Sequence, residues 1–184
     1  MASPAEGWIA GARRVLSPNR DARPPGAVPS LVLVHAISLP RGIYRKDGGG
    51  DAIERLFTNR LDPASHPSFA ELAGLKVSSH FVIYRDAELV QFVPVGERAW
   101  HAGASRWRGR ERCNDHSVGI ELEGVDDAPF ERAQYRALAA LVRTLAARWP
   151  LRAIAAHSDV APGRKTDPGA GFDWRALLRA LASH

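Results

Sequence analysis

The chain has 184 residues, of which 45% are hydrophobic and 24% are charged, a balance that excludes a disordered or fibrous protein. Its net charge of +5 suits either a nucleic acid or a small acidic substrate, so charge alone does not decide the function. The single cysteine, Cys113, excludes an internal disulfide. We therefore expect one domain, residues 1–184, whose core needs no covalent cross-link.

Neither the N-terminal residues nor the longest apolar run has the form of a targeting or membrane segment. The first fourteen residues lack the apolar core of a signal peptide. The run over residues 31–39 is interrupted by His35 and Ser38 and is too short to cross a bilayer. These observations predict a soluble, cytoplasmic protein without a membrane partner.

The first half of the chain is expected to contain an irregular segment, several strands and one short helix. Residues 1–29 are predicted to be irregular and to pack on the domain, since residues 23–29 are rich in proline. Residues 31–37 are apolar on both faces, which indicates a strand inside a sheet. Asp51 is placed to cap a short helix over residues 52–58. Shorter apolar runs predict three further strands, at residues 79–84, 88–93 and 117–123.

The second half is expected to contain two helices and one more strand. Residues 131–149 carry apolar side chains at helical spacing, and Pro150 is expected to end this helix. A short strand over residues 152–156, a loop over 158–172 and a helix capped by Asp173 should follow. Because helices and strands interleave without strict alternation, we predict an α/β (mixed α+β) domain with a central mixed sheet flanked by helices.

Two histidines stand where predicted strands end. His35 lies within an apolar row and His157 follows the strand over residues 152–156, while Asp167 comes ten residues later. Two imidazoles and one carboxylate leave a fourth tetrahedral position open, as in catalytic zinc sites. The alternative for each histidine is a hydrogen-bonded core side chain, and spacing alone does not choose between the two.

Two glutamates and one lysine are candidates for the chemistry. Glu121 and Glu123 share one face of a predicted strand, which is either solvated or part of a polar site. A glutamate beside a metal-bound water is a common general base. Lys165 is one of only three lysines among 25 basic residues, which favours a role as a compact charge beside an oxyanion.

Several motifs in the same order along the chain make the assignment more specific. The sequence resembles bacterial 1,6-anhydro-N-acetylmuramoyl-L-alanine amidases, in the zinc amidase and peptidoglycan-recognition superfamily. The blocks that carry this resemblance are residues 6–9, 33–35, 37–40, 98–103, 109–115, 119–124 and 164–169. The resemblance covers almost the whole chain and supports the single-domain prediction.

The resemblance implies one zinc ion per chain, held by His35, His157 and Asp167, with Glu121 and Lys165 as the catalytic pair. It implies hydrolysis of the amide between anhydro-N-acetylmuramic acid and the L-alanine of the stem peptide, on cytoplasmic cell-wall recycling fragments. For the substrate itself, we expect three further contacts. Arg164 is expected to hold stem-peptide carboxylates, and Trp100 and His101 to flank the sugar, with a packing role equally open for Trp100.

Two positions depart from the family pattern. Ala36 stands where the family has asparagine after the first zinc histidine, and Lys76 stands where it has arginine. In the family both positions are associated with the substrate's peptide. Because lysine cannot reproduce a bidentate contact with a carboxylate, we expect both departures to change affinity rather than hydrolysis.

Two other classes of protein compete with this interpretation. One is a non-catalytic peptidoglycan-recognition module of the same fold, which typically lacks part of the zinc set. The other is a nucleic-acid-binding protein that uses the basic run over residues 106–112 with tryptophans as stacking platforms. Zinc content and a salt-dependent DNA shift distinguish them. We expect a monomeric enzyme that binds anhydro-muropeptides and no nucleic acid.

Overall fold

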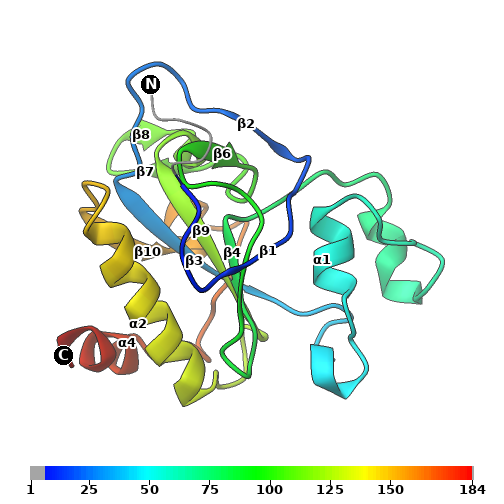
Figure 1. Ribbon diagram of the computed structural model, residues 1–184. Helices are drawn as coiled ribbons and strands as arrows, with labels where there is room; N and C mark the ends of the chain where they lie inside the picture. Colours follow the sequence, from blue (N-terminus) through cyan, green and yellow to red (C-terminus); the bar gives the residue numbers. More distant parts are fainter. Residues whose placement is uncertain (1–6, 184) are drawn as a thin grey trace.

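A six-stranded mixed sheet forms the centre of the computed structural model, which describes residues 7–183 (Figure 1). In spatial order its strands are β1 (Arg13–Arg14), β5 (Leu89–Gln91), β4 (Phe81–Ile83), β9 (Ser117–Glu123), β3 (Leu31–Ile37) and β10 (Ala153–Ala156). All neighbours run parallel except β4 and β5, which are antiparallel. Two small two-stranded sheets pair β2 (Arg20–Ala22) with β6 (Glu97–Ala99) and β7 (Arg106–Trp107) with β8 (Arg110–Glu111). The predicted mixed α/β architecture is confirmed.

The strands agree with the sequence pattern in the middle of the sheet and differ from it at the edge. The expected strands over residues 31–37 and 117–123 are found with those bounds, and β3 lies inside the sheet. The predicted pair over residues 79–84 and 88–93 is present but shorter. The prediction that residues 1–29 are irregular is wrong for part of residues 7–29, because β1 and β2 form by pairing with β5 and β6. Residues 1–6 of that prediction lie outside the described residues.

The helices are α1 (Ala52–Phe57), α2 (Arg132–Ala146), α3 (His157–Val160) and α4 (Trp174–Ala182), with 3-10 turns at Arg45–Asp47, Pro67–Leu72 and Cys113–Asp115. Asp173 caps α4 as predicted, accepting hydrogen bonds from the N–H groups of Arg175 and Ala176. Asp51 precedes α1 but makes no capping hydrogen bond, because its carboxylate pairs with Arg55 one turn later.

Two helix boundaries differ from expectation. α2 ends at Ala146 rather than continuing to Trp149, since the backbone over residues 147–149 closes into turns before Pro150. The predicted loop over residues 158–172 is wrong at its start. There the chain forms α3. The carboxylate of Asp159 in this helix accepts a hydrogen bond from the N–H of Ala156, the residue before it begins. Among the described residues no helix is long and apolar enough to cross a membrane.

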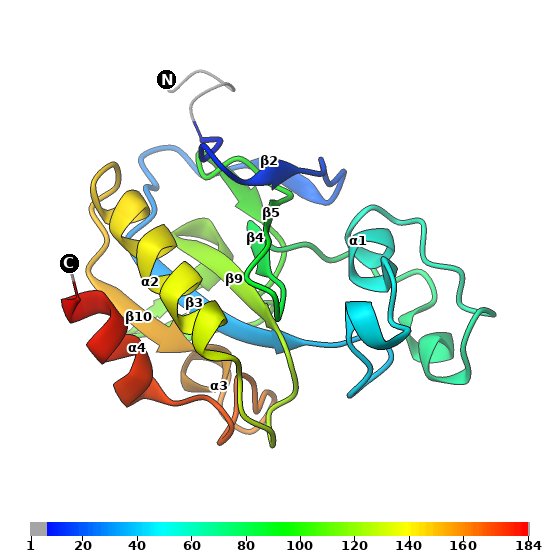
Figure 2. The same cartoon turned by 60° about the horizontal axis from the view of Figure 1, so that its bottom comes forward.

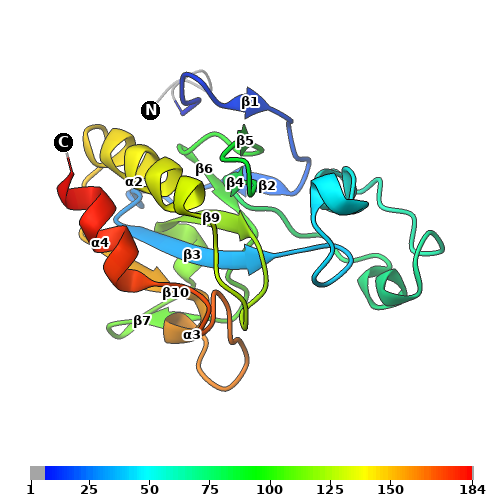
Figure 3. The same ribbon diagram turned by 90° about the horizontal axis from the view of Figure 1, so that it is seen from below.

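The two faces of the sheet have different coverings. Helices α2 and α4 lie together on one face (Figure 2), where Val118, Ile120 and Leu122 pack into the main core. A second core lies on the other face, where Ile53, Leu56 and Phe57 of α1 pack with Val82 and Val90. Figure 3 shows α1 beyond the carboxyl end of β3. Strand side chains alternate between faces, so Glu121 and Glu123 point away from α2. Both are buried, which excludes the solvated-face alternative for this strand.

Gln134 joins the start of α2 to the ends of two strands. Its side-chain oxygen accepts from the N–H of Glu131 at 3.0 Å. Its amide nitrogen donates to the carbonyls of Ile83 and Glu123 at 3.1 and 3.0 Å. The side chain is fully buried, so water cannot replace these bonds.

We predict that Gln134→Ala lowers the free energy of unfolding by about 2–3 kcal/mol, because buried backbone groups lose their hydrogen-bond partners. Arg136→Ala, on the exposed face of α2, should change it by less than about 0.5 kcal/mol. Urea unfolding followed by circular dichroism measures both. Equal stability of the two variants would contradict this role for Gln134.

Candidate metal centre

The register of three parallel strands brings the candidate residues to one place. His35 on β3 is paired with Glu121 on β9, so both side chains lie on the same face of the sheet. On the other side of β3, Ala156 of β10 is paired with Val34. His157, the next residue, therefore reaches the level of His35. Side chains that are far apart in the sequence meet at this edge of the sheet, because parallel strands align their carboxyl ends.

Three ligand-type atoms form a small triangle at this point. The Nδ1 atom of His35 lies 3.0 Å from Nδ1 of His157 and 3.1 Å from Oδ2 of Asp167. The third edge, from His157 Nδ1 to the same Oδ2, is 3.1 Å. Ligands of a tetrahedral zinc with bonds of about 2.0 Å lie about 3.3 Å apart, so the spacing and the chemistry of this donor set fit a zinc ion.

The two imidazoles are held in the form that a metal requires. Both are nearly inaccessible, and burial lowers the pKa of His35 to about 4, although the nearby carboxylate of Asp167 opposes this effect by favouring the charged ring. His35 is therefore neutral at neutral pH, as a metal ligand must be. The Nε2 atom of His157 faces the carbonyl of Ala102 at 3.3 Å, which leaves its Nδ1 free to bind.

Glu121 lies beside this triangle with one oxygen unused. Its Oε1 is 4.0 Å from Nδ1 of His35, and its buried Oε2 has no hydrogen-bond partner among the described residues. Burial raises the pKa of Glu121 well above its usual value. Asp167 adds to this rise, and Lys165 opposes it. An uncompensated buried carboxyl group is costly and is typical of a functional site.

Glu123, two residues further along the same face, has a structural role instead. Its carboxylate accepts hydrogen bonds from the backbone N–H of Arg45 and, at 3.1 Å, from that of Arg85. It thereby ties two loops to the end of β9. The structure thus separates two glutamates that the sequence pattern leaves equivalent.

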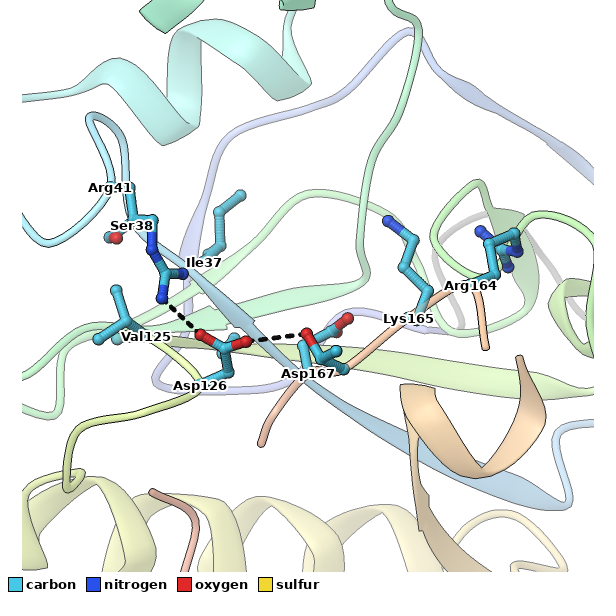
Figure 4. Close-up of a pocket in the computed structure, with 11 residues that line it drawn as sticks. Ile37, Ser38, Arg41, Val125, Asp126, Arg164, Lys165 and Asp167 are labelled. Carbon is cyan, nitrogen blue, oxygen red and sulfur yellow. Dashed lines mark hydrogen bonds and ion pairs between the residues drawn. The ribbon is translucent and has the colours of Figure 1, made fainter. Parts of the chain in front are cut away.

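Two adjoining cavities meet at the triangle. One, of about 190 Å³, is lined by the metal-site residues together with Glu121, Trp100, His101 and Lys165. The other, of about 400 Å³, shares Lys165 and Asp167 with it and extends past Arg164 (Figure 4). Figure 4 also shows Arg41 and Asp126 side by side, at the side of this cavity away from Arg164. Their ion pair measures 2.7 Å.

The residues expected to contact substrate are distributed unevenly. Trp100 and His101 line the smaller cavity, but both ring nitrogens of His101 face protein atoms. Arg164 lines the larger cavity, where its guanidinium donates to the carbonyls of Ala102 and Ala104. Lys76 is exposed and lines a separate cavity of about 100 Å³ beside Leu75.

Sequence reasoning missed the apolar wall of the smaller cavity. Leu56 and Phe57 of α1 and Leu75 and Val77 of the following segment form this wall. None of the four lies in a block that carries the family resemblance. The only signal for Leu56 and Phe57 is the apolar character of a short helix, which indicates burial but not what lies beside it.

Comparison with known proteins gives a consistent result. The sequence profile of the N-acetylmuramoyl-L-alanine amidase family matches residues 25–170. The 1,6-anhydro-N-acetylmuramyl-L-alanine amidase AmpD of Salmonella typhimurium (strain SL1344) is 54% identical to this chain, over 98% of it and 97% of AmpD.

Solved structures are similar as well. The crystal structure of a selenomethionine AmpD derivative matches with a TM-score of 0.91 and 51% identity, over 96% of this chain and 97% of that one. The amidase AmiD of E. coli, in complex with its substrate anhydro-N-acetylmuramic acid-L-Ala-D-γ-Glu-L-Lys, matches with a TM-score of 0.59 and 31% identity. That match covers 86% of this chain and 60% of AmiD.

The contrast between the two glutamates predicts opposite effects on stability. Glu123→Gln should lower the free energy of unfolding by about 1.5–3 kcal/mol, because backbone N–H groups lose a charged acceptor. Glu121→Gln should leave it unchanged or raise it, because it removes a buried ionisable group without a full set of partners. Urea unfolding of both variants with a chelator present measures this. A larger loss for Glu121→Gln would contradict the assignment.

Proposed function

The chain belongs to the N-acetylmuramoyl-L-alanine amidase family, and we propose that it hydrolyses the amide between 1,6-anhydro-N-acetylmuramic acid and the L-alanine of a stem peptide. Relatives named for this activity are similar over nearly the full length of the chain. The observation that carries the proposal is the triangle of His35, His157 and Asp167 beside the buried carboxyl group of Glu121. A donor set of this kind beside an unpaired carboxyl group is suited to hydrolysis of an amide.

The triangle is the proposed binding site for one zinc ion. His35 and His157 would each supply Nδ1, and Asp167 would supply Oδ2. A bound zinc ion supplies a Lewis acid for the scissile carbonyl and lowers the pKa of a bound water. The recognition-module alternative is less well supported, because all three ligand side chains are present and correctly spaced.

Glu121 is the proposed general base and acid. Its unpaired oxygen belongs to a side chain that lines the cavity, so it can take a proton from the attacking water. The same carboxyl group can return that proton to the nitrogen of the departing alanine. A cation at the triangle would lower the raised pKa of this group and favour the ionised base.

Lys165 is the proposed partner of the developing negative charge. It lines both cavities and makes no ion pair with a described carboxylate, so its ammonium group is free for substrate. A positive charge fixed beside the scissile carbonyl stabilises the tetrahedral oxyanion more than the ground state.

The two cavities suggest where the sugar and the stem peptide of the substrate bind. Trp100, which lines the smaller cavity, is proposed to flank the sugar. Arg164, which lines the larger one, is proposed to attract stem-peptide carboxylates. A sugar contact by His101 would use its carbon edge, since its nitrogens are engaged. Lys76 and Ala36 remain predicted determinants of peptide affinity. Ala36 lines both cavities, whereas Lys76 lines neither.

We also infer that the whole chain, residues 1–184, acts as one monomeric domain on recycled cell-wall fragments in the cytoplasm. The nucleic-acid alternative has little support from the basic run, because Arg106 pairs with Glu111 and Arg112 pairs with Asp115. These local ion pairs reduce the positive charge available for phosphates. A salt-dependent shift of DNA by the protein would contradict this inference.

Mass spectrometry of anhydro-muropeptides incubated with the zinc-loaded protein tests the proposed reaction directly. We expect release of the free peptide and of anhydro-N-acetylmuramic acid or its disaccharide. Intact substrate after long incubation with zinc-saturated protein would contradict the proposed activity.

We predict one zinc ion per chain and loss of tight zinc binding in His157→Ala, because only two ligands remain. His66→Ala is the matched control, since the His66 ring bonds locally to Ser68 and lies outside the triangle. Atomic absorption after dialysis measures the zinc content. Full zinc content in His157→Ala would exclude that histidine as a ligand.

Glu121→Gln should retain zinc but lower kcat by about 100-fold or more, as expected when a general base is removed. Glu123→Gln, assayed at a temperature where it is folded, should cost much less. Steady-state hydrolysis of an anhydro-muropeptide gives both values. A larger loss of kcat for Glu123→Gln would reverse the roles assigned on β9.

A further inference from the structure

His101 connects the metal ligand His35 to the start of β9. Its Nδ1 lies 2.9 Å from Nε2 of His35, and the two rings are perpendicular with centroids 5.0 Å apart. Its Nε2 lies 3.3 Å from Oγ of Ser117, and that hydroxyl donates to the carbonyl of Cys113 at 2.6 Å. These contacts form one continuous hydrogen-bond chain. It begins at the backbone carbonyl of Cys113 and ends at His35 in the proposed metal centre.

The direction of every hydrogen bond in this chain follows from its first member. A carbonyl oxygen can only accept, so the Ser117 hydroxyl donates to Cys113 and its own oxygen accepts from Nε2–H of His101. The Nδ1 atom of a neutral His101 then carries a lone pair, which accepts from Nε2–H of His35. Nδ1 of His35 is consequently left with its lone pair directed at His157 and Asp167. The hydrogen bonds through Ser117 and His101 thus favour the Nε2–H tautomer of His35.

The position of His101 is also fixed sterically. A β-carbon on Gly119 would lie only 2.5 Å from the His101 ring, so the ring occupies the space that this glycine leaves open. The backbone on either side is held by Asn114, whose side-chain oxygen accepts from the N–H groups of His101 and Ala102 at 3.2 and 2.8 Å. The ring therefore cannot turn or withdraw from His35 without disturbing β9 or Asn114.

We propose that His101 is a positioning residue for the metal centre, which holds the imidazole of His35 in the tautomer and orientation that binds zinc. The proposal rests on the zinc site of the proposed function. It gives His101 a role that needs no contact with substrate. His157 has a carbonyl partner for the same purpose, whereas His35 depends on a side chain that can be replaced.

Zinc affinity of the metal-free protein, measured by competition with a chromophoric chelator, tests this role. We expect His101→Leu to weaken zinc binding by about 10–100-fold, the usual effect of losing such a partner. His101→Asn, whose side-chain oxygen can accept in place of Nδ1, should recover most of the affinity. His116→Leu is the control, because His116 is a buried histidine that lies outside this hydrogen-bond chain.

Two further measurements separate positioning from folding. Gly119→Ala keeps every imidazole but displaces the His101 ring, so it should also weaken zinc binding. Long-range ¹H–¹⁵N spectra of the metal-free wild-type protein should show His35 protonated at Nε2 only, with the signal assigned by its loss in His35→Ala.

The outcomes are distinguishable. A wild-type protein that binds no zinc would contradict the proposed zinc site itself. Tight wild-type binding with equal affinity in His101→Leu, or a His35 signal from the Nδ1–H tautomer, would overturn the role of His101 alone. A His101→Leu protein too unstable to assay leaves the tautomer measurement, which needs no variant at position 101, to decide.

Discussion

The parallel pairing of β3 with β9 is the constraint on which the rest of the site depends. It places His35 level with Glu121, and the pairing of β10 with β3 adds His157 at the same level. A shift of one residue in either register would turn a whole strand's side chains to the opposite face. That shift would also move Val118, Ile120 and Leu122 out of the core under α2. The apolar face therefore enforces the geometry of the polar one.

The face of β9 that carries Glu121 and Glu123 is buried although both side chains are ionisable. Glu123 has its oxygens bonded to backbone N–H groups, so its burial contributes to stability. Glu121 keeps an oxygen without a partner, and this costs stability in the metal-free protein. The two glutamates of one strand face therefore differ in how their burial is compensated.

Both histidines of the triangle have a protein partner on the ring nitrogen that faces away from it. His157 uses a backbone carbonyl and His35 uses His101, which in turn depends on Ser117 and on the space left by Gly119. Such partners fix ligand orientation before the metal arrives, which reduces the entropic cost of binding. On β9, Gly119 leaves space for the His101 ring, and the hydroxyl of Ser117 contacts its Nε2.

Much of this protein is determined by local sequence patterns. The period-two pattern over residues 117–123, the apolar run over residues 31–37 and the capping aspartate at position 173 each predict their elements, because side-chain alternation and capping are local effects. The ligand types and their positions after strands likewise indicate a metal site. Only the tertiary structure shows that Glu123 bonds to backbone N–H groups, while Glu121 keeps a buried oxygen without a partner among the described residues. It also forms α3 at His157 and turns both ring nitrogens of His101 toward protein atoms. These features depend on contacts between residues far apart in the chain, such as His35 and His157, whose strands meet only when the sheet has closed.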